Sequence, residues 1–466
     1  MKASHKIDPV FDDPNLVGCA GLTPAMMLAQ SAGLHDLLSE HLTVPSPTAG
    51  VKATSVIAGM TAGADNIDDL DILRHGAMTK LFGGIRAPST LGTYLRSFTH
   101  GHVRQLHAVS ARFLAGLAHK APGLLNGATD PGGIAFLDLD DTIGEVHGYQ
   151  KQAAGYGYNK LKGLNAMIAA LSTPLAAPVI VDQSLRKGKT ASGSGSAQML
   201  GRAAATARRA GVNAQMMGRA DSAFYRHDLV AAMIRAGMWF SITARMNPKV
   251  KAALTSIPDD AWTPIKYPKA IWEEDASHPK GGYWVSDAEV AEVNFIAFTS
   301  KKKSHHIPCR LVVRRVKRHQ PRSSDGTVQD ELFAVYRFHA FITNSPLNTI
   351  EADERHRDHA IIEQVIAELK NNALAHLPSG SYAANAAWLA HAVMAFNLMR
   401  ATGVLAGNRL ARARWATLRR KLINIPARIA TTGRRLVLHL PLDWPWAEAF
   451  NDLWTRITSP PPPTPA

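Results

Sequence analysis

Three aspartates stand at the end of an apolar stretch with the sequence Ile134-Ala-Phe-Leu-Asp-Leu-Asp-Asp-Thr142. In an extended strand alternate side chains share a face, so Asp138 and Asp140 project together while Asp141 points to the other side. Two carboxylates on one face repel each other and lose hydration unless a cation or strong hydrogen-bond donors compensate them. A metal ion is the simplest compensation. The alternative is that the strand ends at Asp138 and that the acids lie in a solvated turn.

Two further acids occupy comparable positions later in the chain. Asp221 ends a predicted strand, and Glu363 lies inside a predicted long helix over residues 351–372. Hard divalent cations such as Mg²⁺ take oxygen ligands, and a few carboxylates together with substrate phosphate are sufficient. Two such ions activate a water or a 3′-hydroxyl in phosphodiester cleavage. Each acid also has an ordinary explanation, because Asp221 can cap the next helix and Glu363 can pair with Lys370.

The elements that must position these acids follow from hydrophobic periodicity. The N-terminal quarter carries apolar residues three and four apart, which predicts several short helices. Strands then alternate with helices, as is typical of an α/β core, until a strand-rich stretch interrupts the alternation. We therefore predict a helical N-terminal domain (1–125), the first part of the core (130–258), a β-rich insertion (259–343), a helical second part of the core (344–425) and a basic C-terminal tail (426–466). The N-terminal domain is expected to bind DNA through a helix-turn-helix that presents Arg96, His100, His102 and Arg104, and the alternative is a packing domain with solvated basic residues.

Composition narrows the class of partner. The chain has 466 residues, and 52 Lys and Arg against 37 Asp and Glu give a net charge of +15. This balance favours a polyanion, with nucleic acid before membrane. No apolar run is long enough to span a bilayer, and the polar start is unlike a signal peptide. The two isolated cysteines encode neither a disulfide framework nor a cysteine zinc site. We expect a globular, cytoplasmic, nucleoid-associated protein.

Basic residues cluster around the predicted glutamate helix and in the C-terminal region. We expect the following to contact DNA, although arginines on helices can also be simply solvated or used in packing. The candidates are Arg355, Arg357, Lys370, Arg412, Arg414, Arg419 and Arg420.

Four segments resemble those of a known family. They are Leu137-Asp-Leu-Asp-Asp-Thr142 with Val146-His-Gly-Tyr-Gln150, then Gly218-Arg-Ala-Asp-Ser-Ala-Phe224, then Ile362-Glu-Gln-Val-Ile-Ala-Glu-Leu-Lys370, and Ala395-Phe-Asn-Leu-Met-Arg400. With these the chain resembles DDE-type bacterial insertion-sequence transposases, most of all the group named after insertion sequence thirteen-eighty. The segments are spread over nearly the whole chain, and their order carries the resemblance.

The resemblance implies a ribonuclease-H-like catalytic core and cut-and-paste transposition that depends on Mg²⁺ or Mn²⁺. It assigns the family's two aspartates to Asp140 and Asp221 and its glutamate to Glu363. Asp138 is kept as an alternative metal ligand or as a residue that supports one. The expected partners are double-stranded DNA, as inverted-repeat ends and as target, and a second copy of the chain in the complex with DNA.

One position departs from the family pattern. The arginine expected four residues before the glutamate is His359 here, whereas Lys370 stands seven residues after Glu363 as in the related transposase signature. Two other functions remain open from the sequence. The chain can be a structure-directed nuclease without strand transfer, or a catalytically inactive DNA-binding protein.

Overall fold

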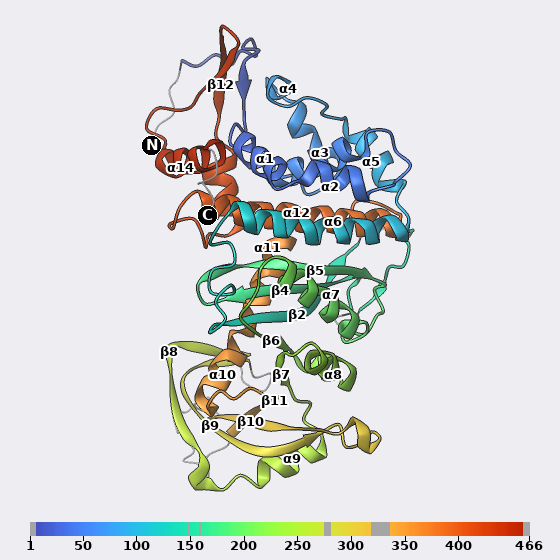
Figure 1. The fold of residues 1–466 in the computed structure, drawn as a ribbon, viewed down its shortest axis with the longest axis vertical. Helices are drawn as coiled ribbons and strands as arrows, with labels where there is room; N and C mark the ends of the chain where they lie inside the picture. The colour runs from blue at the N-terminus through green and yellow to red at the C-terminus, as the bar shows by residue number, and fades with distance from the viewer. Residues whose placement is uncertain (1–5, 147–149, 158–159, 275–280, 318–335, 460–466) are drawn as a thin grey trace, which may run out of the picture.

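The structure is a computed structural model that describes residues 6–146, 150–157, 160–274, 281–317 and 336–459. Residues 147–149 of the segment Val146–Gln150 therefore lie outside the described residues. The molecule is a stack of layers, with helices at one end, a large mixed sheet in the middle and a strand-rich part at the other end (Figure 1). The prediction of a mixed α/β protein is confirmed.

The N-terminal part is helical, as its apolar spacing predicts. Its helices pack on one another through small and aliphatic residues, and Thr99 caps the longest of them by accepting a hydrogen bond from the backbone of His102. The helices are α1 (Leu22–Ser31), α2 (Leu34–His41), α3 (Ala49–Ala62), α4 (Met78–Leu81), α5 (Pro88–Arg96) and α6 (His100–Lys120), with a 3₁₀ turn, η1 (Asp68–Arg74), between α3 and α4.

Helix α12 (Tyr382–Leu405) runs through the centre of the molecule. It contacts α6, α3 and strand β5, so it lies between the N-terminal helices and the sheet (Figure 1). Nearly all of its side chains are buried, including the polar His391 and Asn397, which are hydrogen-bonded. One continuous hydrophobic core consequently joins the N-terminal helices to the sheet.

The sheet has a mixed strand order. In the half that carries the predicted acids the order is β5-β4-β2-β6-β7, in which β4 is antiparallel to both β5 and β2, and β2, β6 and β7 are parallel. The short β3 (Gly155–Tyr156) pairs with the start of β4, on the edge that β5 occupies further along the strand. The bounds are β2 (Ile134–Glu145), β4 (Lys162–Thr173), β5 (Ala176–Arg186), β6 (Gln215–Ala220) and β7 (Trp239–Thr243), with α7 (Ser196–Arg209) before β6, and with η2 (Ser222–Phe224), α8 (His227–Arg235) and α9 (Pro248–Thr255) after it.

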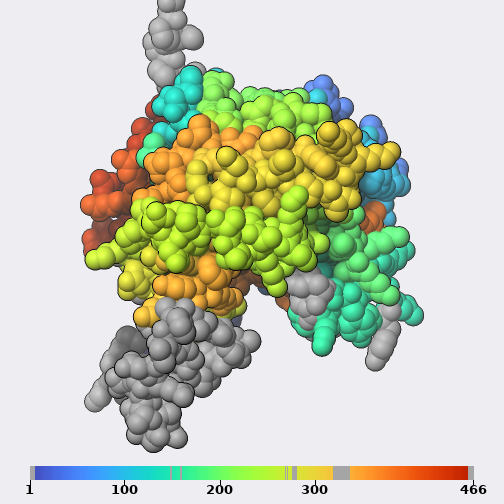
Figure 2. Space-filling model, turned by 90° about the horizontal axis from the view of Figure 1, so that it is seen from below, coloured from blue at the N-terminus to red at the C-terminus, as the bar shows by residue number. Residues whose placement is uncertain are grey.

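The strand-rich stretch continues the same sheet instead of forming a separate one. Its last strand pairs with β7, and the order then runs β11-β10-β9-β8. These strands cover the face seen from the end opposite the N-terminal helices (Figure 2). They are β8 (Thr263–Glu274), β9 (Gly282–Ala297), β10 (Ile307–Lys317) and β11 (Tyr336–Thr343).

The long helix predicted over residues 351–372 is divided in the structure. It consists of α10 (Thr349–Arg357), a 3₁₀ turn, η5 (Asp358–Ala360), and α11 (Ile361–Lys370). The stripe Ile362, Val365 and Leu369 of α11 is buried, as its spacing predicts. The interruption lies where His356 hydrogen-bonds to β7 and His359 hydrogen-bonds to β2.

The C-terminal segment expected as a basic tail is folded. After α13 (Trp415–Leu418) and η6 (Arg419–Ile423), strands β12 (Ala427–Thr432) and β13 (Arg435–His439) form a small sheet with β1 (Leu16–Val17). Helix α14 (Ala447–Thr458) then packs against α1 and α12. It forms because its Phe450 and Leu453 are buried in this contact, an apolar pattern that the high arginine content obscures.

Candidate active site

Strand register brings the first two predicted acids together. Strand β2 pairs in parallel with β6, with Asp138 opposite Arg219 and Leu139 opposite Ala220. Continuing this register by one residue sets Asp140 beside Asp221, the residue that follows β6. Neighbouring strands lie about 4.8 Å apart, so the two carboxylates lie side by side at the end of β6 and in the middle of β2. The negative charge of Asp221 contributes to raising the pKa of Asp140.

Asp138 is compensated by protein donors. Its side chain is fully buried, and Arg219 donates Nε to Oδ1 at 2.7 Å and Nη2 to Oδ2 at 2.8 Å. His359 Nδ1 lies 2.8 Å from Oδ1, and Ser172 donates its hydroxyl to Oδ2 at 3.2 Å. Burial alone would raise the pKa of Asp138, but the charge of Arg219 and the hydrogen bonds hold it below its ordinary value. Both of its oxygens are therefore occupied.

Asp141 is compensated on the opposite face of β2. Its Oδ2 accepts hydrogen bonds from Asn165 at 2.6 Å and from the guanidinium of Arg186. Arg186 itself is held in place by Asn165 Oδ1 and by the carbonyl oxygens of Ser192 and Ser194. Asp141 is 6% exposed and Arg186 is 8% exposed, so this is a buried ion pair.

Asp140 lies between these two pairs on β2, and no cation within the described ranges pairs with it. Its one hydrogen bond among the described residues comes from the backbone N–H of Asp141, at 2.7 Å to Oδ1. Burial raises the pKa of Asp140 to about 7, and the neighbouring charges of Asp221 and Asp141 add to the rise, while that N–H and His359 oppose it. Of the three aspartates on β2, Asp140 is the one whose charge the described residues leave uncompensated.

Asp221 stands at the rim of the site. Its Oδ1 accepts the backbone N–H of Ala223 at 2.9 Å and so caps the 3₁₀ turn η2, whereas the next α-helix, α8, begins at His227 without a side-chain cap. Burial raises the pKa of Asp221, whereas hydrogen bonds from the backbone N–H groups of Ala223 and Phe224 lower it. Oδ2 has no partner among the described residues, so one oxygen of this carboxylate stays available.

Glu363 approaches the site from α11. This helix packs on β2, and its two ends are marked by contacts: His359 reaches Asp138, and Lys370 Nζ lies 3.5 Å from Thr142 Oγ1. A helix rises about 1.5 Å per residue and a strand about 3.3 Å, so Glu363 stands about 6 Å beyond His359, as Asp140 does beyond Asp138. The carboxylate is exposed, and no ion pair with Lys370 is found within the described parts of the chain.

The donor set suits a hard cation. All three predicted ligands are carboxylates, and the uncompensated charge of Asp140 next to Asp221 is what Mg²⁺ or Mn²⁺ would neutralise. No three His, Cys, Asp or Glu side chains among the described residues stand close enough together to form a complete set of ligands. The two aspartates thus lie side by side where β6 ends, and Glu363 lies on α11, the helix that packs on β2.

The predicted DNA-binding residues fall into two groups. Three are held by the protein: Arg357 pairs with Asp353 at 2.9 Å, Arg419 donates to Asn372 at 2.8 Å, and Arg355 lies 3.5 Å from Asp358. The others are exposed and keep their charge toward solvent. These are Lys370, Arg412, Arg414 and Arg420.

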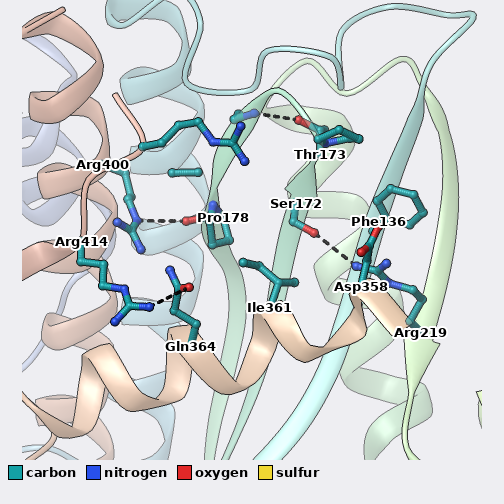
Figure 3. Close-up of a pocket in the computed structure, with 14 residues that line it drawn as sticks. Phe136, Ser172, Thr173, Pro178, Arg219, Asp358, Ile361, Gln364, Arg400 and Arg414 are labelled. Atoms are coloured by element: carbon teal, nitrogen blue, oxygen red, sulfur yellow. Dashed lines mark hydrogen bonds between the residues drawn. The ribbon is translucent and has the colours of Figure 1, made fainter. Parts of the chain in front are cut away.

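A pocket of about 520 Å³ lies behind α11 (Figure 3). Arg400 and Arg414 reach it from one side, Phe136 and Arg219 from the other, and Gln364 projects from α11 between them. Buried Arg400 is neutralised by Glu368 at 2.8 Å, as Arg219 is by Asp138. Arg414 has only a 3.3 Å hydrogen bond to Gln364, and Arg412 at the same mouth has no partner among the described residues. The mouth of the pocket is therefore cationic.

The two arginines that neutralise Asp138 and Asp141 are not predictable from the sequence spacing. Arg186 is 45 residues from Asp141, and Arg219 is 81 residues from Asp138. A signal was present for Arg219, because an arginine inside an apolar strand that becomes a core element requires a buried acid. His359 stands out in the sequence only because it replaces the arginine of the family pattern, and nothing in the sequence indicates its hydrogen bond to Asp138.

Comparison with known proteins identifies a family. No helix within the described ranges combines the length and the low charge needed to cross a bilayer. No match was found among curated proteins. The family model described as "Transposase DDE domain group 1" matches residues 2–462, which is almost the whole chain. The chain therefore belongs to the DDE transposase family.

Proposed function

We propose that this transposase binds the inverted-repeat ends of its element and catalyses metal-dependent cleavage and strand transfer. Asp140, Asp221 and Glu363 hold Mg²⁺ or Mn²⁺ in this proposal. The proposal rests on the different environments of the three aspartates on β2. Arginines neutralise Asp138 and Asp141, whereas Asp140 stays uncompensated beside Asp221. A cation completes that arrangement at lower cost than any rearrangement of the fold.

The bound metal supplies the chemistry of phosphoryl transfer, because it lowers the pKa of an attacking water or 3′-hydroxyl and stabilises the leaving oxygen. The protein's own residues hold and orient the reactants. Asp140 and Asp221 give the site its negative charge on the sheet, and Glu363 approaches from the helix above. Asp138 supports the site through His359 and does not act as a ligand, because its oxygens already accept four hydrogen bonds.

The strand order supports a ribonuclease-H-like core. The arrangement β5-β4-β2-β6-β7, with three antiparallel strands followed by two parallel additions, agrees with such a core, and the acids lie at its centre. We propose that residues 1–125 recognise the ends, that residues 130–258 and 344–425 form the catalytic core, and that residues 259–343 are its insertion. Within the DDE family, the four motifs favour the insertion sequence thirteen-eighty group. Action on two ends at once implies a homodimer on DNA.

DNA contacts are proposed for the exposed cations. Arg412 and Arg414 stand at the mouth of the pocket behind α11, Lys370 ends the helix that carries Glu363, and Arg420 is exposed nearby in sequence. Guanidinium groups bind phosphates in a bidentate manner, which suits them to the DNA backbone. Arg355, Arg357 and Arg419 contribute less, because acids or amides of the protein already bind them.

The experiment measures cleavage and end binding separately. Purified variants Asp140→Asn, Asp221→Asn and Glu363→Gln are incubated with a labelled duplex that carries the inverted repeat flanking the reading frame. We expect each variant to bind the duplex as the wild type does in EDTA and to lose cleavage in Mg²⁺. Wild-type rates in Asp221→Asn would disprove the metal assignment.

Two other functions give different results in the same assay. A structure-directed nuclease would cut the duplex but would not join the cut end to a target DNA. A catalytically inactive DNA-binding protein would bind without nicking at any metal concentration. Joining of the 3′ end to target DNA, seen as a slower-migrating labelled product, supports the transposase.

A further inference from the structure

A chain of buried hydrogen bonds connects the sheet to the segment that precedes the glutamate helix. Arg219 on β6 holds Asp138 on β2 through both carboxylate oxygens, and Asp138 in turn holds His359. Because an ionised carboxylate only accepts hydrogen bonds, the Nδ1 of His359 must be the donor. The bond therefore fixes both the tautomer and the orientation of the imidazole ring. The ring is mostly covered, with its side chain 15% exposed.

The position of His359 on the helix relates it to Glu363. Glu363 follows His359 by four residues and precedes Lys370 by seven, so Glu363 and Lys370 share one face of α11, and His359 lies in the 3₁₀ turn directly before this helix. His359 contacts β2 at Asp138, and Lys370 lies near β2 at Thr142. Glu363 is thereby held between two points that flank Asp140 along the strand.

Apolar packing alone would leave this arrangement poorly defined. The buried stripe of α11 is aliphatic, and hydrophobic contact is non-directional. A slip of one residue turns a helix by about 100°, which would direct Glu363 away from the aspartates. A charge-assisted hydrogen bond to a buried carboxylate is directional and selects one rotation.

The 3₁₀ turn before α11 adds to this attachment. In η5 the helix tightens between His356 and Ile361, and an interruption of this kind inside a helix often marks a functional constraint. His356 lies 2.8 Å from Ser241 Oγ and 3.0 Å from Thr243 Oγ1 on β7, while His359 reaches β2. The segment is thus bound to two strands of the sheet just before Glu363.

We propose that His359 is a positioning residue for Glu363. Its Nδ1–H bond to Asp138, which Arg219 holds in place, sets the rotation and height of α11 so that Glu363 faces Asp140 and Asp221. The inference rests on the proposed function, since it takes Glu363 to be a metal ligand. It gives position 359 a role inside the protein, which does not require a contact with DNA.

Three substitutions separate the two ring nitrogens. His359→Asn keeps a donor near the place of Nδ1, His359→Gln places its amide near Nε2, and His359→Ala removes both. We expect kcat for cleavage of the inverted-repeat duplex to fall about 10- to 100-fold in the Ala and Gln variants, and the Mg²⁺ concentration for half-maximal rate to rise about 10-fold. The Asn variant should recover most of the rate. Affinity for the duplex in EDTA should equal that of the wild type in all three.

The control is His376→Gln. His376 Nδ1 lies 3.0 Å from Asp65 Oδ1, which is the same type of bond away from α11, and its loss should leave kcat and the Mg²⁺ requirement unchanged. Urea unfolding midpoints verify that each variant is folded. If the Ala variant does not fold, the comparison of the Asn and Gln variants still tests the proposal.

Other outcomes would overturn the proposal. An active Gln variant with an inactive Asn variant would assign the role to Nε2, and a loss of duplex affinity at normal kcat would indicate a DNA contact. Wild-type kcat and Mg²⁺ dependence in all three variants would exclude any positioning role. Glu363→Gln is measured in parallel: if it still cleaves, the proposed function fails, whereas its inactivity beside fully active His359 variants refutes the positioning role alone.

Discussion

The three aspartates of β2 should respond differently to the same substitution. Replacing Asp138 or Asp141 by Asn leaves a buried guanidinium without its counter-charge, since Arg219 is 1% and Arg186 is 8% exposed. Breaking a buried ion pair from one side costs about 3–5 kcal/mol. Asp140→Asn removes a charge that the fold does not compensate, so this variant should be as stable as the wild type or more stable.

The size of the Asp140 effect follows from its pKa. A rise from 3.8 to about 7 corresponds to an upper limit of about 4 kcal/mol of unfavourable free energy for the ionised carboxylate. Since Asp140 is partly accessible to water, we expect about 1–2 kcal/mol of stabilisation in the Asn variant. The folded-state pKa is the higher one, so the penalty is absent below pH 4, grows as the pH rises and is complete above pH 7.

Urea unfolding in EDTA at pH 8 and pH 4.5 measures these differences. At pH 8 we expect the free energy of unfolding to be highest for Asp140→Asn, lower for the wild type and lowest for Asp138→Asn and Asp141→Asn. At pH 4.5 the difference between Asp140→Asn and the wild type should be smaller. Adding Mg²⁺ at ten times its dissociation constant should stabilise the wild type by about 1.4 kcal/mol and leave Asp140→Asn unchanged. Equal destabilisation by all three substitutions would refute the view that the fold compensates two acids and leaves one.

Two further results are expected. Arg412→Ala and Arg414→Ala should each lower the slope of log K against log salt by about 1 for duplex DNA, whereas Arg357→Ala should leave it unchanged because Asp353 already binds that guanidinium. Burial lowers the pKa of His391 to about 4, so about 3 kcal/mol of stability that is present above pH 6.5 should be lost as the pH falls to 4, and His391→Gln should flatten this part of a urea-midpoint profile against pH.

Much of the fold was accessible from the sequence because it depends on local periodicity. The alternation of strands and helices and the buried stripe of α11 follow from spacing alone. The expected end of the strand at the acids is wrong, because β2 continues to Glu145 as the antiparallel partner of β4. The adjacency of Asp140 and Asp221 follows once the two strands are taken as parallel neighbours. The extent of the sheet did not follow, because the pairing of β7 with β11 joins segments about a hundred residues apart.

The sequence could not predict which aspartates of β2 pair with arginines and which one stays unpaired. Alternation sets Asp138 and Asp140 on one face, and by itself treats them alike. Their difference arises from Arg219 on the neighbouring strand, which stands opposite Asp138 and two positions short of Asp140. Such long-range partners depend on strand register, which a single sequence does not encode in any local pattern.

This pairing of arginines with aspartates has a consequence for folding without metal. If Asp138, Asp140, Asp141 and Asp221 were all unpaired, four carboxylates would be crowded around the middle of β2 and the end of β6, and the fold would depend on cations to form. Arg219 and Arg186 neutralise Asp138 and Asp141, which leaves Asp140 and Asp221 without a cationic partner among the described residues. The core can then assemble before any metal arrives, and the remaining charge is confined to the place where a cation is needed. Stability and metal affinity are thereby assigned to different carboxylates of one strand.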